Sequence, residues 1–211
     1  MKCKGVYVVI EGIEGSGKTT HACLLHKHLF DKGLEPVLVR EPGGTVLGEK
    51  ARQLLLADSV EMNPLEEFLL FSLARSALHR EVIIPTCAAG KIVISDRNYF
   101  SSIAYQGHGG NLNQEFVQQV TSAVTFGTLP DIIILLDAPL EEILPIVRAK
   151  QGQDRFETQN LAFFERVYQG YQQLKARAHV IIRYRKNDEI GMQEEIRAAV
   201  EKKLAEFTQN P

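Results

Sequence analysis

The stretch "EGIEGSGKTT", Glu11 to Thr20, decides how the rest of this sequence is interpreted. Residues 12–19 match the pattern G-x-x-x-x-G-K-[ST] at every fixed position. The apolar run "GVYVVI" precedes them, as expected of a buried strand, and apolar residues recur at helical spacing afterwards. A strand, a glycine-rich loop and a helix in this order indicate a phosphate-binding loop and not an ordinary turn.

The chemistry of this loop suits a nucleoside triphosphate, and ATP is the predicted ligand. Glycines let backbone N–H groups approach phosphate oxygens, and the N-terminus of the following helix adds a positive dipole end. Lys18 is expected to reach the β- and γ-phosphates, and the hydroxyl of Thr19 is expected to ligate Mg²⁺. The predicted nucleotide-binding residues are Gly12, Ile13, Glu14, Gly15, Ser16, Gly17, Lys18, Thr19 and Thr20.

The remainder of the chain alternates strand and helix patterns. Strands are predicted at 5–10, 36–40, 91–96, 131–137 and 179–184. Helices are predicted at 18–32, 47–56, 63–85, 99–106, 113–125, 140–149, 159–177 and 192–207, with a kink near Pro85. The strands are continuous apolar runs, which predicts helices on both faces of a parallel sheet. We therefore expect one α/β domain over residues 1–211, a five-stranded parallel sheet with the P-loop NTPase fold.

Composition and charge argue against several functional classes. The formal net charge of −2 does not favour binding to nucleic acid or to an acidic membrane, and no apolar stretch reaches the roughly 20 residues of a membrane span. Cys3, Cys23 and Cys87 lack metal-ligand spacing. An odd number of cysteines without a disulfide framework favours a reducing compartment, so a cytoplasmic protein is expected. His21, His26 and His28 are interpreted as a solvated face of the first helix.

Arginines at the predicted strand ends indicate a second anion site. Ligands of open α/β sheets bind beyond the carboxyl ends of the strands. Arg40 and Arg97 each follow a strand directly, and Arg52 lies on the helix after the "EPGG" loop. Guanidinium groups match phosphate geometry, so the cluster favours a phosphorylated acceptor. Any one of these arginines taken alone is more typical of a surface or ion-pair residue, and it is the two directly after strand ends that favour an anion site.

Two further features belong to the same region of the sequence. Asp96, at the end of the third strand, is the preferred carboxylate for Mg²⁺, and Asp137 after the fourth strand is the alternative. Phe71 and Arg75 are four residues apart and share one helix face, where they could stack on a nucleobase and bond its edge. A core position for Phe71, beside Phe68 and several leucines, is the competing interpretation.

These residues alone leave three classes of protein open. A kinase of a phosphorylated small molecule uses both anion sites. A deoxynucleoside kinase needs no arginine clamp, and a P-loop switch that binds a protein partner needs no acceptor site. The segment "RKNDE" does not have the order of a guanine-specificity motif, which argues against a GTPase.

The sequence resembles the thymidylate kinase family over nearly its whole length. The resemblance rests on "EGIEGSGKTT", "REPGGT", "LLFSLAR", "SDRNYFSSIAYQG" and "RAKQGQDRFE", in the family's order. It implies the reaction of ATP with dTMP to give ADP and dTDP in the presence of Mg²⁺, and it implies a homodimer. It also implies that Phe71 stacks on thymine, that Arg75 bonds the base edge, and that Arg97 holds the dTMP phosphate. The other substrate residues that it implies are Glu14, Arg40, Glu41, Arg52, Ser102, Tyr105 and Gln106.

The resemblance further implies a lid at about residues 148–158. Some family members carry an arginine where this chain has Gly15, and the others take the neutralising charge from the lid. Arg155 is expected to be that charge, with Lys150 as an alternative, and Arg148 to stack on adenine. The implied catalytic residues are thus Glu14, Lys18, Arg97 and Arg155. The chain departs from the family's pattern in two ways. Its lid has fewer arginines than is usual, and Asn98 stands where an aromatic residue or histidine is common.

Overall fold

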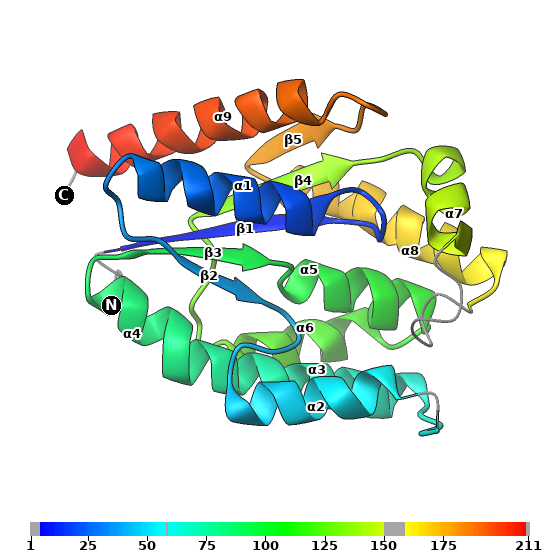
Figure 1. Ribbon diagram of the computed structural model, residues 1–211. Helices are drawn as coiled ribbons and strands as arrows, with labels where there is room; N and C mark the ends of the chain where they lie inside the picture. Colours follow the sequence, from blue (N-terminus) through cyan, green and yellow to red (C-terminus); the bar gives the residue numbers. More distant parts are fainter. Residues whose placement is uncertain (1–4, 58, 150–158, 210–211) are drawn as a thin grey trace.

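The computed structural model describes residues 5–57, 59–149 and 159–209, and these residues adopt the predicted α/β fold (Figure 1). Five parallel strands form one sheet in the order β2-β3-β1-β4-β5. The strands are β1 (Val6–Gly12), β2 (Val37–Arg40), β3 (Ile92–Asp96), β4 (Ile132–Asp137) and β5 (Val180–Arg183). All five therefore direct their carboxyl ends to one edge of the sheet, toward the right in Figure 1.

Helices cover both faces of this sheet. They are α1 (Lys18–Asp31), α2 (Val46–Leu56), α3 (Pro64–Leu78), α4 (Ile84–Ala88), α5 (Tyr99–Ser102), α6 (Gln114–Val124), α7 (Leu140–Ala149), α8 (Leu161–Leu174) and α9 (Glu189–Gln209). Two π-helical turns, η1 (His79–Ile83) and η2 (Ile103–Gly109), and a 3₁₀ turn, η3 (Lys175–Arg177), extend neighbouring helices. In Figure 1, α1 and α9 lie on one side of the sheet, and α3, α4 and α5 lie on the other.

The core explains why the strands are continuous apolar runs. In β1, Val8 and Ile10 pack with residues of α1 and α9, whereas Tyr7 and Val9 pack with Leu78 and other residues of the opposite layer. Successive side chains of a strand point to opposite faces, so both sets must be apolar when both faces are covered. Among the described residues, no helix has the length and apolar character needed to span a bilayer.

The helix that carries Phe71 and Arg75 begins as predicted. The Asn63 side chain accepts the backbone N–H groups of Leu65 and Glu66, and the Glu66 carboxylate accepts the N–H of Asn63. This capping box satisfies backbone donors that the first helical turn leaves free. It fixes where α3 starts and hence which of its faces meets the sheet.

The expected break near Pro85 takes the form of a π-helical turn. Helical structure continues through η1 into α4, past Pro85 to Ala88. A proline has no N–H to donate, and its ring crowds the preceding turn. A local widening into the π-helical form accommodates the ring without ending the helix.

The interpretation of the α1 histidines as a solvated face is wrong. The His21 side chain is buried and contacts Gln193 Oε1 through Nδ1 at 2.7 Å. His28 contacts Glu201 at 2.6 Å. Both partners belong to α9, which lies across α1 (Figure 1). The helical spacing of α1 alone carries no sign of this distant partner.

Candidate functional site

The glycine-rich loop joins β1 to α1 at the carboxyl edge of the sheet. Gly12, Gly15 and Gly17 have φ values of 150°, 81° and 89°, which side chains rarely adopt. A Cβ atom on Gly12 would lie 2.7 Å from the Leu136 carbonyl oxygen, so the close approach to β4 also requires glycine. The loop therefore has the compact backbone that the sequence pattern predicts.

Gly15 lies beneath α7. A Cβ atom at this position would come within 3.3 Å of Ile146 Cγ2 and 3.5 Å of Ile143 Cγ2. Together with the positive φ, this contact disfavours any larger residue at position 15. The loop itself therefore carries no cation at position 15, and the lid as the source of the neutralising charge stays a prediction.

Lys18 begins α1 and points back over the loop. Its side chain is only 5% exposed, and Nζ donates to the Ile13 carbonyl oxygen at 2.8 Å. Burial, with help from the nearby Arg97, lowers the pKa of Lys18 to about 7, although Asp96 and other carboxylates oppose this shift. A buried ammonium of this kind is strongly stabilised by an approaching anion.

Thr19 and Asp96 meet beside the loop. The Thr19 hydroxyl donates to Asp96 Oδ2 at 2.5 Å. The buried Oδ1 of Asp96 has no hydrogen-bond partner among the residues that the structure describes. Asp137, the alternative carboxylate, forms an ion pair with Lys175 at 2.7 Å.

This pair of oxygens fits Mg²⁺. The described parts of the chain contain no group of three or more His, Cys, Asp or Glu side chains that could hold a metal. Mg²⁺ does not need one, since it binds through one or two protein oxygens together with phosphate oxygens and water. The Thr19 hydroxyl and the Asp96 carboxylate, whose Oδ1 has no partner in the described part of the chain, are compatible with the donor set of such a site.

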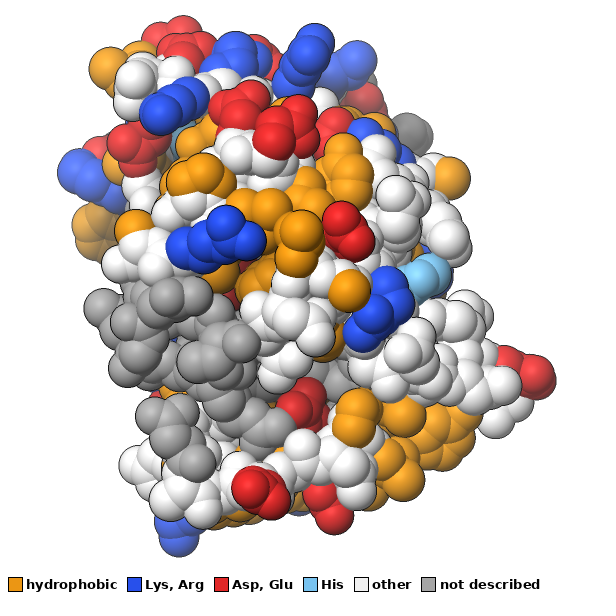
Figure 2. All heavy atoms as spheres, turned by 90° about the vertical axis from the view of Figure 1, so that its right-hand side faces the viewer, with side chains coloured by type: hydrophobic (Ala, Val, Ile, Leu, Met, Phe, Trp, Pro, Cys, Tyr) orange, Lys and Arg blue, Asp and Glu red, His pale blue; other side chains and the backbone are white. Residues whose placement is uncertain are grey.

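A cavity of about 400 Å³ opens next to the loop. It brings together the predicted residues Glu14, Thr19, Arg40, Glu41, Arg52, Phe71, Asp96, Arg97, Ser102, Tyr105 and Gln106. These residues lie between the glycine loop and η2 and are up to 92 positions apart (14 to 106), yet the fold places them around one space. Figure 2 looks onto the right-hand side of Figure 1, where acidic and basic side chains are interspersed with apolar ones.

Arg97 occupies a strained position at the end of β3. Its φ is 75°, and its guanidinium lies 5.4 Å from the centre of the Tyr105 ring. Its Nη1 donates to Ser101 Oγ at 3.0 Å. Burial acts to lower the pKa of Arg97, but the neighbouring Tyr105, Tyr171 and carboxylates raise it above its ordinary value. Arg97 is thus a permanently charged donor on the cavity wall.

Arg40 and Arg52 line the same cavity with partners of their own. Arg40 Nη2 lies 3.0 and 2.9 Å from the two carboxylate oxygens of Glu49. Arg52 Nη1 donates to the carbonyl oxygen of Pro42 at 3.1 Å. The arginine cluster predicted from the sequence therefore exists, and Glu49 is an acidic member that the sequence pattern did not reveal.

Phe71 lies on the cavity wall and not in the core. The buried cluster nearby contains Phe68, whereas Phe71 is only half-buried and lines the 400 Å³ cavity. Tyr105 closes another side of this cavity, and its hydroxyl accepts the backbone N–H of Glu14 at 3.0 Å. Burial raises the pKa of Tyr105 to about 12, so its hydroxyl stays neutral.

Arg75 lies directly behind this wall, with 1% of its surface exposed. Its Nε donates to Glu41 Oε2 at 2.7 Å, and its Nη2 donates to Ser102 Oγ at 3.0 Å and to the Asn98 carbonyl oxygen at 3.2 Å. Arg75 Nη1 and Glu41 Oε1 are buried without a hydrogen-bond partner in the described part of the chain. Burial raises the pKa of Glu41 in spite of the ion pair with Arg75.

Three residues of the site were missed by sequence reasoning. Glu11, Ser101 and Tyr171 form a buried hydrogen-bonded group beside Arg97. The available signal was Glu11 itself, a carboxylate at the end of an otherwise apolar strand, which the pattern treats only as the end of that run. Ser101 stands next to the predicted Ser102, and helical spacing alone does not separate their roles.

Only the first residues of the predicted lid lie in the described part of the chain. Arg148 is exposed in the last turn of α7. Lys150 and Arg155 lie outside the described residues. The structure therefore places the start of the predicted lid near the phosphate loop, through the contact of α7 with Gly15, and gives no position for the expected charge donor.

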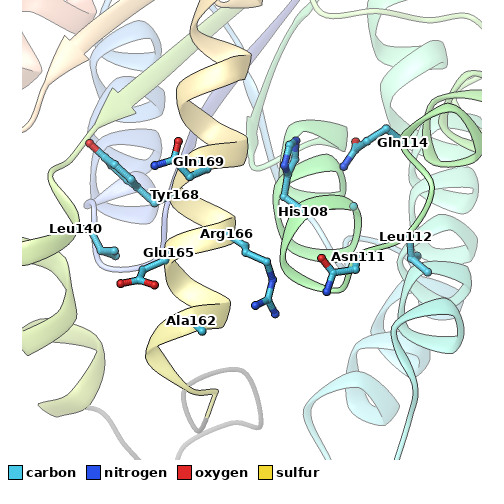
Figure 3. A pocket seen from close by; sticks show the side chains of 11 residues that line it. His108, Asn111, Leu112, Gln114, Leu140, Ala162, Glu165, Arg166, Tyr168 and Gln169 are labelled. Carbon is cyan, nitrogen blue, oxygen red and sulfur yellow. The ribbon is translucent and has the colours of Figure 1, made fainter.

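A larger cavity, of about 840 Å³, lies between the segment from η2 to the start of α6 and helix α8 (Figure 3). Its wall includes His108 and Gln114 on one side and Arg166 and Tyr168 of α8 on the other. Arg166 uses both Nε and Nη2 to donate to the Gly109 carbonyl oxygen, at 3.0 and 2.7 Å. This cavity contains no residue of the glycine loop, so the smaller one is the better candidate for phosphate chemistry.

Comparisons with known proteins agree with the geometry. A family model described as thymidylate kinase matches residues 10–196. A thymidylate kinase of Deinococcus radiodurans is 43% identical over 170 residues, which cover 80% of this chain and 82% of the relative. One of Prochlorococcus marinus is 38% identical over 98% of this chain and 99% of the relative. The crystal structure of thymidylate kinase from Ehrlichia chaffeensis matches with a TM-score of 0.76 and 30% identity, covering 93% and 98% of the two chains.

Proposed function

This chain belongs to the thymidylate kinase family, and on that premise we propose that it transfers the γ-phosphoryl group of ATP to dTMP, giving ADP and dTDP. One observation carries the proposal. The glycine loop with Lys18 and the cavity with Arg97 adjoin at Asp96, so two anion sites face each other at one sheet edge. Such an arrangement suits transfer between two phosphates.

The donor side positions ATP. The backbone N–H groups of the glycine loop hold the phosphates, and Lys18 neutralises the β- and γ-phosphates. Thr19 and Asp96 would hold Mg²⁺ there, which would screen the negative charge of the triphosphate. On the family resemblance, we propose that Arg155 adds the remaining charge and that Arg148 packs against adenine. Glu14, a residue of the glycine loop that also lines the cavity, would contact the acceptor sugar or the shell of the metal.

The acceptor side positions dTMP. Arg97 would hold its phosphate, with Arg40 and Arg52 on the same wall. The phosphate has a second pKa of about 6, so its oxygen is ionised at neutral pH and needs no strong base. Catalysis then consists of alignment and of stabilising charge on the transferring group.

The base would lie between Phe71 and the polar wall of the cavity. Phe71 supplies an aromatic face, and Arg75 has one N–H-bearing nitrogen without a partner in the described residues. On the family resemblance, that nitrogen would bond the base edge, although Arg75 lies behind the residues that line the cavity. Ser102 and Gln106 would supply further polar contacts. Tyr105 would lie beneath the sugar, where bulk disfavours a 2′-hydroxyl. Glu41 would hold Arg75 in place.

A panel of acceptors tests this proposal. ADP release is measured with dTMP, dUMP, dCMP, AMP and thymidine, each with ATP and Mg²⁺. We expect dTMP to give the highest kcat/KM and thymidine, which has no phosphate for Arg97, to give no turnover. A preference for thymidine would indicate a deoxynucleoside kinase instead. ATP hydrolysis that responds to no nucleotide at all would indicate a switch protein.

Phe71→Ala is expected to raise the KM for dTMP about 5- to 150-fold, since stacking of a base on an aromatic side chain contributes about 1–3 kcal/mol. The KM for ATP should stay within about twofold, because Phe71 lies on the acceptor wall. Steady-state kinetics with each substrate varied in turn measure both values. Phe30→Ala, which truncates an exposed phenylalanine of α1 outside this cavity, is the matched control. An unchanged KM for dTMP would place the base elsewhere.

Binding of ATP is expected to take up a proton at alkaline pH. The pKa of Lys18 is about 7 in the nucleotide-free protein, and bound phosphates will raise it. Between these two values, about one proton joins the complex, so ATP affinity falls as the pH rises above 7. Calorimetry at pH 8 in two buffers of different ionisation enthalpy measures this uptake. Lys18→Met should lack it, and equal uptake by both proteins would refute the assignment.

We propose a second copy of the chain as the protein partner. Leu65, Leu69 and Leu73 recur every four residues along α3 and are each more than 40% exposed. Phe116 of α6 lies beside them, in contact with Phe68. This apolar stripe suits an isologous helix-to-helix contact in a homodimer. Light scattering in solution distinguishes a dimer from a monomer.

Both proposed nucleotides are intracellular metabolites, which supports the cytoplasm as the site of the reaction.

A further inference from the structure

Glu11 is a buried carboxylate to which the proposed reaction gives no role. It is the penultimate residue of β1, next to the first glycine of the loop, and is 0% exposed. Its Oε1 accepts the backbone N–H groups of Asn98 at 2.7 Å and of Ser101 at 3.0 Å. Its Oε2 accepts the Gly12 N–H at 3.1 Å and the hydroxyls of Ser101 and Tyr171 at 3.0 Å. Five donors converge on it, an environment built for an acceptor-only carboxylate.

Hydrogen bonds hold both the backbone and the guanidinium of Arg97. The strained backbone at Arg97 is fixed on one side by its own N–H, which donates to the Ile10 carbonyl oxygen at 3.0 Å. On the other side, the next N–H, that of Asn98, donates to Glu11. The guanidinium donates to Ser101 Oγ, and that hydroxyl donates in turn to Glu11 Oε2. A strained conformation persists only where its surroundings determine it in this way.

We propose that Glu11 is a positioning residue that fixes the backbone turn and the guanidinium direction of Arg97, and thereby the place of the acceptor phosphate. The inference rests on the proposed function. Glu11 also accepts the N–H of Gly12, the first glycine of the loop, so one carboxylate ties the donor loop to the acceptor arginine. Its own charge is satisfied by five donors and is separated from Arg97 by the Ser101 hydroxyl.

The test compares dTMP with thymidine, which lacks the phosphate that Arg97 is proposed to hold. Glu11→Gln keeps the side-chain shape but replaces an acceptor oxygen by an amide donor. Calorimetry should show the Kd for dTMP rising about 10- to 100-fold, the loss expected for a hydrogen bond to a charged group. The Kd for thymidine should change by less than about threefold, because the base contacts of Phe71 and Arg75 remain. A purely structural role would weaken both ligands together.

Two further variants separate the path through Ser101 from general damage. Ser101→Ala removes the link between Arg97 and the carboxylate and should reproduce the selective loss of dTMP affinity. Tyr171→Phe is the matched control, because it removes a donor to the same oxygen of Glu11 and its hydroxyl has no hydrogen bond to Arg97 among the described residues. It should leave the ratio of the two affinities unchanged. An equal effect of both variants on this ratio would overturn the proposal.

A double-mutant cycle completes the test. If Glu11 acts through Arg97, then Glu11→Gln combined with Arg97→Ala should bind dTMP no more weakly than Arg97→Ala alone. Additive losses would contradict this. Should Glu11→Gln fail to fold in a thermal scan, the Ser101 and Tyr171 variants decide the question. If the wild type prefers another monophosphate, the proposed function fails, and the same comparison of that nucleotide with its nucleoside still tests Glu11.

Discussion

Lys18→Ala is expected to reduce kcat for dTMP phosphorylation by about 10³-fold, the upper range for loss of one preorganised electrostatic group. Lys18 is the cationic side chain of the stretch 12–19, and its ammonium is held over the loop by the Ile13 carbonyl oxygen. No rearrangement is then needed when phosphate binds. Steady-state kinetics with saturating dTMP and ATP measure the effect.

The fold of this variant should be at least as stable as that of the wild type. The pKa of Lys18 is lowered from 10.5 to about 7, so the folded state disfavours the ammonium. The unfolded chain binds more protons between these values, and the stability of the wild type therefore rises with pH across this window. Removing Lys18 removes that penalty. Lys27→Ala, at an exposed ion pair with Asp31 on the same helix, is the control for both kinetics and stability. A kcat within tenfold of wild type would exclude Lys18 from the reaction.

Arg75→Ala is expected to lower the free energy of unfolding by about 3–5 kcal/mol, because it leaves Glu41 as a buried charge without its partner. Both side chains are almost wholly buried, and Arg75 also donates to the Asn98 carbonyl oxygen and to Ser102. Urea unfolding followed by circular dichroism gives the value. Arg40→Ala breaks an exposed pair with Glu49 and should cost no more than about 1 kcal/mol.

The pH dependence of this variant identifies the cause. Without Arg75, the folded-state pKa of Glu41 rises further above its unfolded value. The folded state then binds more protons than the unfolded chain, so stability is present at low pH and is lost as the pH rises from the unfolded-state pKa of Glu41 through its raised folded-state pKa. Adding Glu41→Gln should remove this dependence and recover part of the loss. If the loss of unfolding free energy depends neither on pH nor on the Glu41→Gln substitution, then Arg75 stabilises the fold by packing and not by its charge.

Local sequence signals were sufficient for most of the fold. The glycine loop, the apolar strands and the Asn63 capping box each depend on residues within a few positions of one another, so spacing alone predicts them. The five strands and the helical segments appear within a few residues of their expected bounds. The π-helical turn before Pro85 was not predicted, because it is one of several ways in which a helix can accommodate proline.

The sequence predicted most of the residues that line the cavity, but it did not predict which of the charged side chains form ion pairs. Strand ends of a parallel sheet gather at one edge, which explains why Arg40 and Arg97 line one space. Phe71 reaches the same space from α3. The pairing of Arg40 with Glu49, or of Arg75 with Glu41, depends on side-chain directions that spacing does not encode. The contacts of Glu11 were not predicted for the same reason, since most of its hydrogen-bond donors are 87 to 160 residues away in the sequence.

The central claim is direct transfer between two facing anion sites, and following the γ-phosphoryl group tests it most directly. ATP labelled with ³²P at the γ-position is incubated with the protein, Mg²⁺ and dTMP, and the products are separated by chromatography. We expect the label in dTDP, in a one-to-one ratio with the ADP formed. Label released as inorganic phosphate while dTMP remains unchanged would contradict the account.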